Sequence, residues 1–180
     1  ATINRVQSSE FLAQGEIENA KKSLVLYRKS LKSAIAIDPK NMSPYFRLCA
    51  SLLNEYRLTQ NKEMLEEALA VADEGDKIGE NLEQFVIVRA DVLQADGQLE
   101  RAIEQLRQYI EKTPNSDSVR QRLVEAYLDI NNVNRAIAVV EEGIKNNPNS
   151  SDWFRQLGDL KFRVNNDRGG AAMAYIEAIK

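Results

Sequence analysis

The residue types that most often carry out catalysis are scarce in this chain. Its 180 residues include no histidine and a single cysteine, Cys49. Without an imidazole, no histidine can activate the thiol or bind a metal ion, and no disulfide can form within the chain. Cys49 falls at a position where small residues recur, so structural burial is favoured over a role as a nucleophile. We therefore expect no catalytic residue, no metal site and no cofactor.

The remaining candidates for chemistry are adjacent carboxylates and one glycine-rich segment. The pairs Glu66-Glu67 and Glu141-Glu142 diverge by about 100° on a helix, so neither forms an acid/base pair, and exposed helix faces are favoured. The segment Arg168-Gly169-Gly170 precedes an expected helix, where backbone N–H groups can bind an anion. It lacks the spacing of a phosphate-binding loop, so a hairpin turn is favoured there.

The elements that position these residues repeat along the chain at one constant interval, which we call the repeat interval. Pairs separated by this interval include Gly97 and Asn131, Ala102 and Ala136, Pro114 and Pro148, and Leu123 and Leu157. Glycine (8) and proline (4) are rare, which favours helix. A helical chain with this period is expected to form stacked helix pairs. Function is then expected on an extended surface and not in a catalytic pocket.

Turn and cap signals divide the chain into helix pairs. The expected repeats are residues 8–41, 42–82, 83–116, 117–150 and 151–180, within a single domain of residues 1–180. Gly97 and Asn131 are expected to adopt the left-handed conformation between helices, and Ser43-Pro44 is expected to start a helix. Small residues at Ala68, Ala102, Ala136 and Ala171 allow helices to cross closely. Because the chain starts at Ala1 without Met, we expect it to be a fragment of a longer protein.

This pattern resembles the tetratricopeptide repeat (TPR) family, well over residues 42–180 and loosely over 8–41. The matching residues are Ala90, Leu93, Gly97, Ala102, Leu106 and Pro114, then Val124, Tyr127, Asn131, Ala136, Val140 and Pro148, and then Leu157, Gly158, Ala171, Tyr175 and Ala178. The chain departs from the pattern at Glu80, where proline is usual, and at Gly75, Tyr109 and Gly143, where alanine is usual. The resemblance implies an all-α, right-handed superhelical solenoid of about five antiparallel helix hairpins.

In the TPR family the first helices line a concave groove that binds partners. The resemblance places these residues in the groove: Phe46, Arg47, Asn54, Gln84, Asp91, Gln121, Arg122, Glu125, Arg155, Asp159 and Phe162. Within this set Asp91, Glu125 and Asp159 recur at the repeat interval and would form an acidic ladder. The ladder either meets Lys or Arg of a bound peptide or pairs internally. The internal partners would be Arg122 for Glu125, and Arg155 or Arg163 for Asp159, and this second interpretation is favoured.

The function expected from these observations is a scaffold or adaptor that binds a protein or peptide, not an enzyme. One alternative is a regulatory or substrate-presenting segment of a larger enzyme, such as a glycosyltransferase. Another is a homodimer formed through an apolar face of the C-terminal helix, with Ala171, Ala174, Tyr175 and Ala178.

Charge and hydropathy exclude other partner classes. A net charge of −3 and a pI of about 5.2 argue against nucleic acid as a partner, and no apolar run approaches the roughly 20 residues that membrane insertion needs.

Residues 1–40 carry seven Lys or Arg against four Asp or Glu, and their basic helix, including Arg28 and Lys32, is interpreted as a solvated face.

Overall fold

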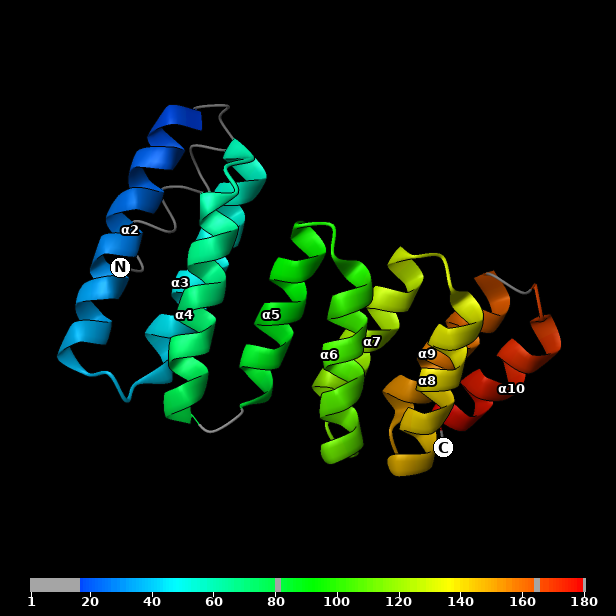
Figure 1. Ribbon diagram of the computed structural model, residues 1–180. Coiled ribbons are helices and arrows are strands. Elements are labelled where there is room, and N and C mark those ends of the chain that lie inside the picture. The colour runs from blue at the N-terminus through cyan, green and yellow to red at the C-terminus, as the bar shows by residue number, and fades with distance from the viewer. Residues whose placement is uncertain (1–16, 80–81, 164–165, 180) are drawn as a thin grey trace. The chain divides into compact units, whose positions relative to one another are not determined.

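The computed structural model describes residues 17–79, 82–163 and 166–179, and these residues form helices without any strand (Figure 1). They belong to two compact units, residues 1–97 and 98–180. The expectation of an all-α helical repeat fold is confirmed. Handedness and the repeat boundaries stay predictions, and residues 8–16 of the first expected repeat lie outside the described residues.

The first unit contains α2 (Ile17–Ile37), α3 (Met42–Thr59), α4 (Glu63–Gly79) and α5 (Glu83–Ala95). Its core includes Tyr45, Leu52 and Phe85, all buried. Helices α3 and α4 pack on each other, with α4 in front of α3 in Figure 1. These helices have 18 and 17 residues, whereas α5 has 13. The greater length of α3 and α4 explains why the small residues Cys49 and Ala90 lie further apart than the repeat interval.

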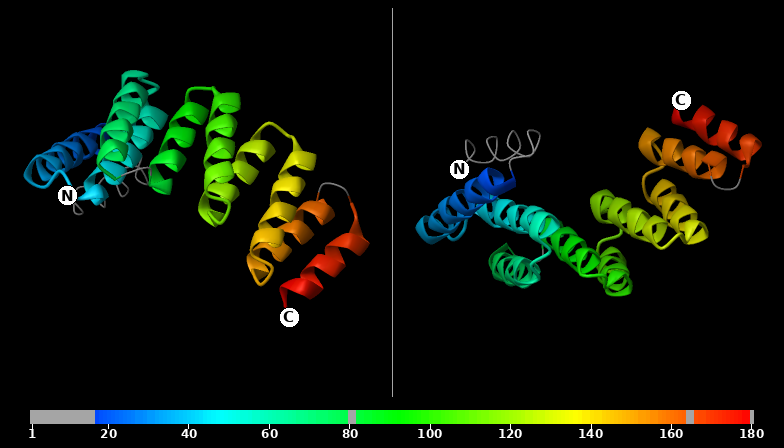
Figure 2. Two further views of the ribbon diagram at one scale, coloured as in Figure 1. Left: turned by 60° about the horizontal axis from the view of Figure 1, so that its bottom comes forward. Right: turned by 90° about the horizontal axis from the view of Figure 1, so that it is seen from above.

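The second unit contains α6 (Leu99–Lys112), α7 (Asp117–Asp129), α8 (Val133–Asn146), α9 (Ser151–Arg163) and α10 (Arg168–Ala178). Each of these helices packs on the next one in the chain. The two views of Figure 2 show α9 and α10 lying side by side and antiparallel. The second helices of the pairs are α6, α8 and α10, and the first helices are α7 and α9.

Left-handed residues stand in several turns between successive helices. Gly97 has φ 77° and Asn131 has φ 55°, which confirms both predictions. Asn166, with φ 49°, closes the turn between α9 and α10 and comes one position later than the repeat interval would place it. The last pair therefore has a turn that is longer by a single residue. Gln60, with φ 56°, adopts this conformation between α3 and α4 although its residue type does not indicate it.

The predicted starts of two helices, α3 and α10, differ from the observed starts by a few residues. Helix α3 starts at Met42 and not at Ser43, because the Asn41 side chain accepts a hydrogen bond from the backbone N–H of Ser43 over 3.1 Å. The segment Arg168-Gly169-Gly170 forms the first turn of α10 and not the hairpin turn. It does so because the Asp167 side chain caps the helix, accepting a hydrogen bond from the Gly170 N–H over 2.8 Å.

Small side chains lie where helices approach each other. Ala68, Ala102, Ala136 and Ala171 are all buried, with at most 1% of their surface exposed. Their burial agrees with positions between packed helices, and the expectation that alanine permits close crossing there stays a prediction.

Candidate functional site

The groove residues expected on α7 lie close together and interact with one another. The Arg122 guanidinium lies 3.8 Å from Glu125 Oε2, and the Gln121 side-chain amide donates to Glu125 Oε1 over 3.4 Å. The expected pairing of Glu125 with Arg122 is therefore present. The Glu125 side chain nevertheless keeps 52% of its surface exposed, so it can still meet a ligand.

Asp159 on α9 is bonded to a different residue from the one expected. Its Oδ1 accepts a hydrogen bond of 2.8 Å from the Tyr175 hydroxyl on α10. Glycine at position 158 makes this possible, because a Cβ there would lie 2.6 Å from the Tyr175 ring. The hydrogen bond, and to a lesser degree desolvation, raises the pKa of Tyr175 above its ordinary value of 10.0.

Arg155 also differs from the expectation. Its guanidinium pairs with Asp152, one turn earlier on α9, at 2.8 Å. Sequence spacing allowed Arg155 to reach either carboxylate, and the hydrogen bond from Tyr175 holds Asp159. The prediction of an Arg155–Asp159 pair was wrong for this reason. Phe162, in the last turn of α9, keeps 51% of its surface exposed.

The non-core residues of α7 and α9 follow the repeat interval. Gln121 corresponds to Arg155, Glu125 to Asp159, and Leu128 to Phe162. None of these six side chains is fully buried. We call this surface the α7–α9 face, comprising Gln121, Arg122, Glu125, Leu128, Arg155, Asp159 and Phe162. Each helix thus presents a polar, an acidic and an apolar residue in the same order.

The groove residues expected in the first unit have more varied surroundings. The Phe46 ring packs on the Phe85 ring with centroids 4.4 Å apart, so Phe46 belongs to the edge of the core and not to an open groove. Arg47 and Gln84 are exposed. Asn54 is exposed as well, and its side-chain oxygen accepts from Arg57 over 3.5 Å.

Asp91, the first member of the acidic ladder, is half-buried on α5. It belongs to the first unit, whereas Glu125 and Asp159 belong to the second. A continuous ladder of all three residues therefore stays a prediction.

The residues expected to form a self-association face on α10 are largely covered within the chain. Ala171 and Ala174 are buried, and Tyr175 and Ala178 are half-buried. These residues are covered because α10 packs on α9 in the same chain, where the Tyr175 ring contacts Gly158. Ala171 and Ala174 are therefore closed to a second copy, whereas Tyr175 and Ala178 keep part of their surface accessible.

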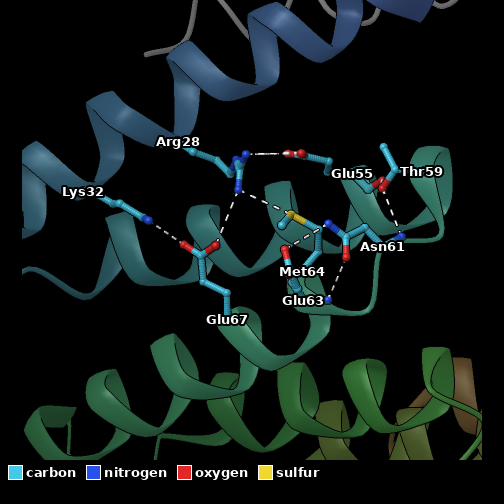
Figure 3. A network of polar contacts seen from close by, with 8 residues as sticks. All are labelled: Arg28, Lys32, Glu55, Thr59, Asn61, Glu63, Met64 and Glu67. Carbon is cyan, nitrogen blue, oxygen red and sulfur yellow. Dashed lines mark hydrogen bonds and ion pairs between the residues drawn. The ribbon is translucent and has the colours of Figure 1, made fainter.

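Sequence reasoning missed a polar network that joins α2, α3 and α4 (Figure 3). The Arg28 guanidinium lies 2.9 Å from Glu55 Oε2 and 3.5 Å from Glu67 Oε2, and it donates to Met64 Sδ over 3.4 Å. Lys32 Nζ lies 2.6 Å from Glu67 Oε1. Arg28 was interpreted as part of a solvated face, but 14% of its side chain is exposed. Its partners all lie on other helices, so helical spacing gave no signal.

A second missed contact joins α7 to α9. Asp117 Oδ1 accepts from the Trp153 indole N–H over 3.0 Å, and Asp117 Oδ2 accepts from the Asn147 side chain over 3.1 Å. Beside it Arg120 is buried and donates to the Pro114 carbonyl oxygen over 2.9 Å. An aspartate at a helix start indicates only a favourable charge near the helix N-terminus, so its long-range role was not visible.

The second unit also has a pocket of about 400 Å³ between α6 and α8, closed on one side by α7. Leu123, Tyr127 and Val139 supply its apolar wall, and Arg135 lies over the Tyr127 ring, 5.8 Å from its centroid. Residues of the α7–α9 face do not line this pocket.

The surroundings of Cys49 agree with a structural role. The side chain is buried, and its Sγ lies 3.4 Å from the Ala68 carbonyl oxygen. Burial raises the pKa of the Cys49 thiol to about 12, although Arg89 has a small opposite effect. A thiol with this pKa is a poor nucleophile at neutral pH.

Residues 17–79, 82–163 and 166–179 offer neither a cluster of metal ligands nor a membrane-spanning helix. Among these residues no group of three or more Asp, Glu or Cys side chains could hold a metal ion. No helix in the same residues is long and apolar enough to cross a membrane.

Comparison with known proteins agrees with the repeat pattern. A family model described as tetratricopeptide repeat matches residues 93–158. No curated protein matches the chain significantly. Similar solved structures include a thermophilic TPR protein, TTC0263, from Thermus thermophilus, with a TM-score of 0.62 at 17% identity, covering 88% of this chain and 97% of that one.

Two other solved structures cover more of this chain. MamA from Desulfovibrio magneticus RS-1 has a TM-score of 0.57 at 18% identity and covers 99% of this chain and 92% of its own. YrrB, described as a TPR protein with an unusual peptide-binding site, has a TM-score of 0.51 at 18% identity and covers 96% and 81%. At these identities the likeness concerns the fold.

Proposed function

We propose that this chain, a tetratricopeptide-repeat protein by its fold and by the repeat at residues 93–158, is a non-enzymatic module that binds a segment of a partner protein. The surface that we assign to this function is the α7–α9 face. A repeat fold distributes its surface over successive helices and does not enclose a reaction site. Binding through a row of equivalent helices suits this architecture.

One observation supports this assignment above the others. Equivalent positions on α7 and α9 carry polar, acidic and apolar side chains in the same order, and all of them stay outside the core. Packing within the unit does not require this order, since the core uses other positions such as Leu123 and Leu157. A peptide that follows the repeat would meet the same chemistry on each helix.

The exposed groups define the chemistry of the partner. The carboxylate of Glu125 favours a Lys or Arg side chain, and Phe162 favours an apolar one. Asp159 already accepts from Tyr175 through one oxygen. That YrrB is described as a TPR protein with a peptide-binding site supports a peptide as the ligand class.

A peptide-display selection on the purified chain tests the proposal. We expect enriched peptides to combine a basic and an apolar residue. Their affinity should fall about tenfold in both Glu125→Lys and Phe162→Ser, which corresponds to losing about 1.4 kcal/mol per contact. Glu141→Lys is the matched control, because it makes the same charge change at an exposed position of α8.

Asp159 is left unchanged in this experiment, because reversing its charge would also break the contact with Tyr175. Circular dichroism should show the same helicity in all variants. Peptides that bind equally well to Glu125→Lys, Phe162→Ser and Glu141→Lys would exclude the α7–α9 face. Failure to enrich any peptide would contradict peptide binding itself.

A further inference from the structure

We infer that α10 carries a second interaction surface, through which two copies of this chain pair with their α10 helices antiparallel. The surface is separate from the α7–α9 face. It consists of Gly169, Ala172, Met173 and Ile176, all of them exposed, and we call it the α10 seam.

The first observation is the exposure of large apolar side chains on α10. Met173 keeps 72% of its surface exposed and Ile176 53%, and Ile179, which follows the helix as its C-cap, keeps 85%. Apolar side chains that cluster on one exposed helix face often mark an interaction site. The opposite face of α10 packs on α9 in the same chain, where Ala171 and Ala174 are buried.

The second observation separates this seam from ordinary stacking of repeats. Helices α6, α8 and α10 can be aligned by their N-cap residues, which are Gln98, Asn132 and Asp167. This alignment allows for the extra residue in the turn before α10. Ile176 then corresponds to Arg107 and Glu141, both exposed and charged. Met173 corresponds to Glu104 and Ala138, also exposed.

Packing against a following helix would therefore not bury Met173 and Ile176. In α6 and α8 the equivalent positions stay in solvent even though each helix packs on the next one. Ile179, by contrast, corresponds to Ile110 and Ile144, which are both half-buried. A further repeat would cover Ile179 and leave Met173 and Ile176 exposed, so these two residues suit a different partner.

The third observation is that the seam complements itself in size. Residues 169, 172, 173 and 176 share one face of the helix, with two small side chains towards its N-terminus and two large ones towards its C-terminus. In an antiparallel pair Ile176 of one copy lies opposite Gly169 of the other, and the same contact forms twice. A twofold pair of this kind closes on itself and is the commonest form of homo-oligomer.

The small residues also set how close the helices come. Gly169 has space around it, since the nearest atom to a Cβ built there is Asp167 Oδ1 at 3.8 Å. Helices approach to about 8 Å where side chains are small. The seam is only about two turns long, so the dimer is weak, as is usual for small interfaces.

Cysteine cross-linking tests both the pairing and its direction. In Gly169→Cys/Ile176→Cys the antiparallel register places residue 169 of one copy beside residue 176 of the other, and we expect disulfide-linked dimers under mild oxidation. In Ile176→Cys alone the two introduced thiols lie about 10 Å apart along the helices, because of the helical rise between the two register positions. That distance prevents a disulfide, so little dimer should form.

The controls use the same chain. Glu141→Cys places a thiol at the position of α8 equivalent to Ile176 and measures random collision, and the buried Cys49 is common to all variants. Sedimentation of the unmodified chain up to roughly 1 mM should show a weak monomer–dimer equilibrium, consistent with a small interface. Ile176→Asp should abolish this equilibrium without changing helicity.

Three results would overturn the inference. The first is a chain that remains monomeric over the whole concentration range. The second is a dimer that persists in Ile176→Asp. The third is cross-linking of the single variant Ile176→Cys that equals or exceeds that of the double variant, because it would indicate a parallel or unrelated pairing.

Discussion

The indole N–H of Trp153 donates a hydrogen bond of 3.0 Å to Asp117 Oδ1, from α9 to α7. The other oxygen of Asp117 accepts from Asn147. The Asp117 carboxylate at the start of α7 thus accepts hydrogen bonds from Asn147, which caps the end of α8, and from Trp153 in the first turn of α9. This contact fixes two consecutive repeats to each other independently of their apolar core.

Removing this carboxylate should loosen the second unit. We expect Asp117→Ala to lower the free energy of unfolding by about 1–2 kcal/mol, because two hydrogen bonds to a charged group are lost. Asp117→Asn should lose less stability than Asp117→Ala, since its single side-chain oxygen still accepts one of the two hydrogen bonds. Trp153 is the only tryptophan, so its fluorescence during urea unfolding reports this unit directly. Equal stability of the alanine variant and the unmodified chain would contradict the assignment.

The contact between Tyr175 and Asp159 should make stability depend on alkaline pH. The pKa of Tyr175 is raised in the folded chain, so its protonated hydroxyl stabilises the fold below about pH 10, and this contribution disappears as pH rises through the folded pKa. We expect Tyr175→Phe to melt at a lower temperature than the unmodified chain at pH 7. The difference should shrink above pH 10. A difference that stays constant up to pH 11 would argue against this hydrogen bond.

The close approach of α8 and α9 should not tolerate a methyl group at position 143. A Cβ on Gly143 would lie 2.8 Å from the Trp153 ring and 3.0 Å from Arg120 Cδ. We expect Gly143→Ala to destabilise the chain by about 1–3 kcal/mol through overpacking. Gly169→Ala is the control, because the nearest atom to its Cβ is Asp167 Oδ1 at 3.8 Å, an ordinary van der Waals contact, and alanine favours helix by about 0.5–1 kcal/mol. Thermal unfolding at low chain concentration compares the two, and equal effects would contradict the packing argument.

The network in Figure 3 should couple α2 to α3 energetically. Arg28 and Glu55 are mostly buried, with 14% and 13% of their side chains exposed. Arg28→Met and Glu55→Gln should each cost about 1–3 kcal/mol, because the first removes the cation that lies beside Glu55 and the second leaves Arg28 with Glu67 alone, at 3.5 Å. The double variant should cost less than the sum. Urea unfolding of the four proteins completes the cycle, and strictly additive effects would show that the ion pair contributes nothing.

Cys49 should react only when the chain unfolds. Its pKa of about 12 lies above the ordinary value of 9.0, so the neutral thiol stabilises the fold below about pH 9, and this contribution disappears as pH approaches about 12. We expect a thiol reagent at pH 8 to modify the native chain at the rate of unfolding, and the chain in urea at once. Rapid modification of the native chain would contradict the burial of Cys49.

The sequence predicted the repeat architecture well because this information is local. Positions such as Ala102 and Ala136 recur with the period of the helix pair, and Gly97 and Asn131 supply the left-handed conformation that separates helices. These preferences depend on a few neighbouring residues. Boundaries were less accurate where two capping residues compete, as Asn41 and Ser43 do before α3.

The candidate site was predicted only as a set of positions. The hydrogen-bond partner of each side chain depends on which of several groups within reach lies nearest. Helical spacing alone allows more than one such partner. Asp159 had two candidate arginines on its own helix, yet it bonds with Tyr175 on α10. Gly158 decides this outcome, because the absence of its side chain brings the tyrosine ring close to α9.

By itself, then, the sequence determined that the chain is helical and that it turns at Gly97 and Asn131, because backbone propensity and apolar periodicity act over short distances. Tertiary structure alone decided which face of α10 is left exposed, how Arg28 and Asp117 are paired, and that Phe46 joins the core. Each of these depends on groups distant in sequence that packing brings within a few ångströms. Ion pairs and hydrogen bonds form between groups that are close in space, whatever their separation along the sequence.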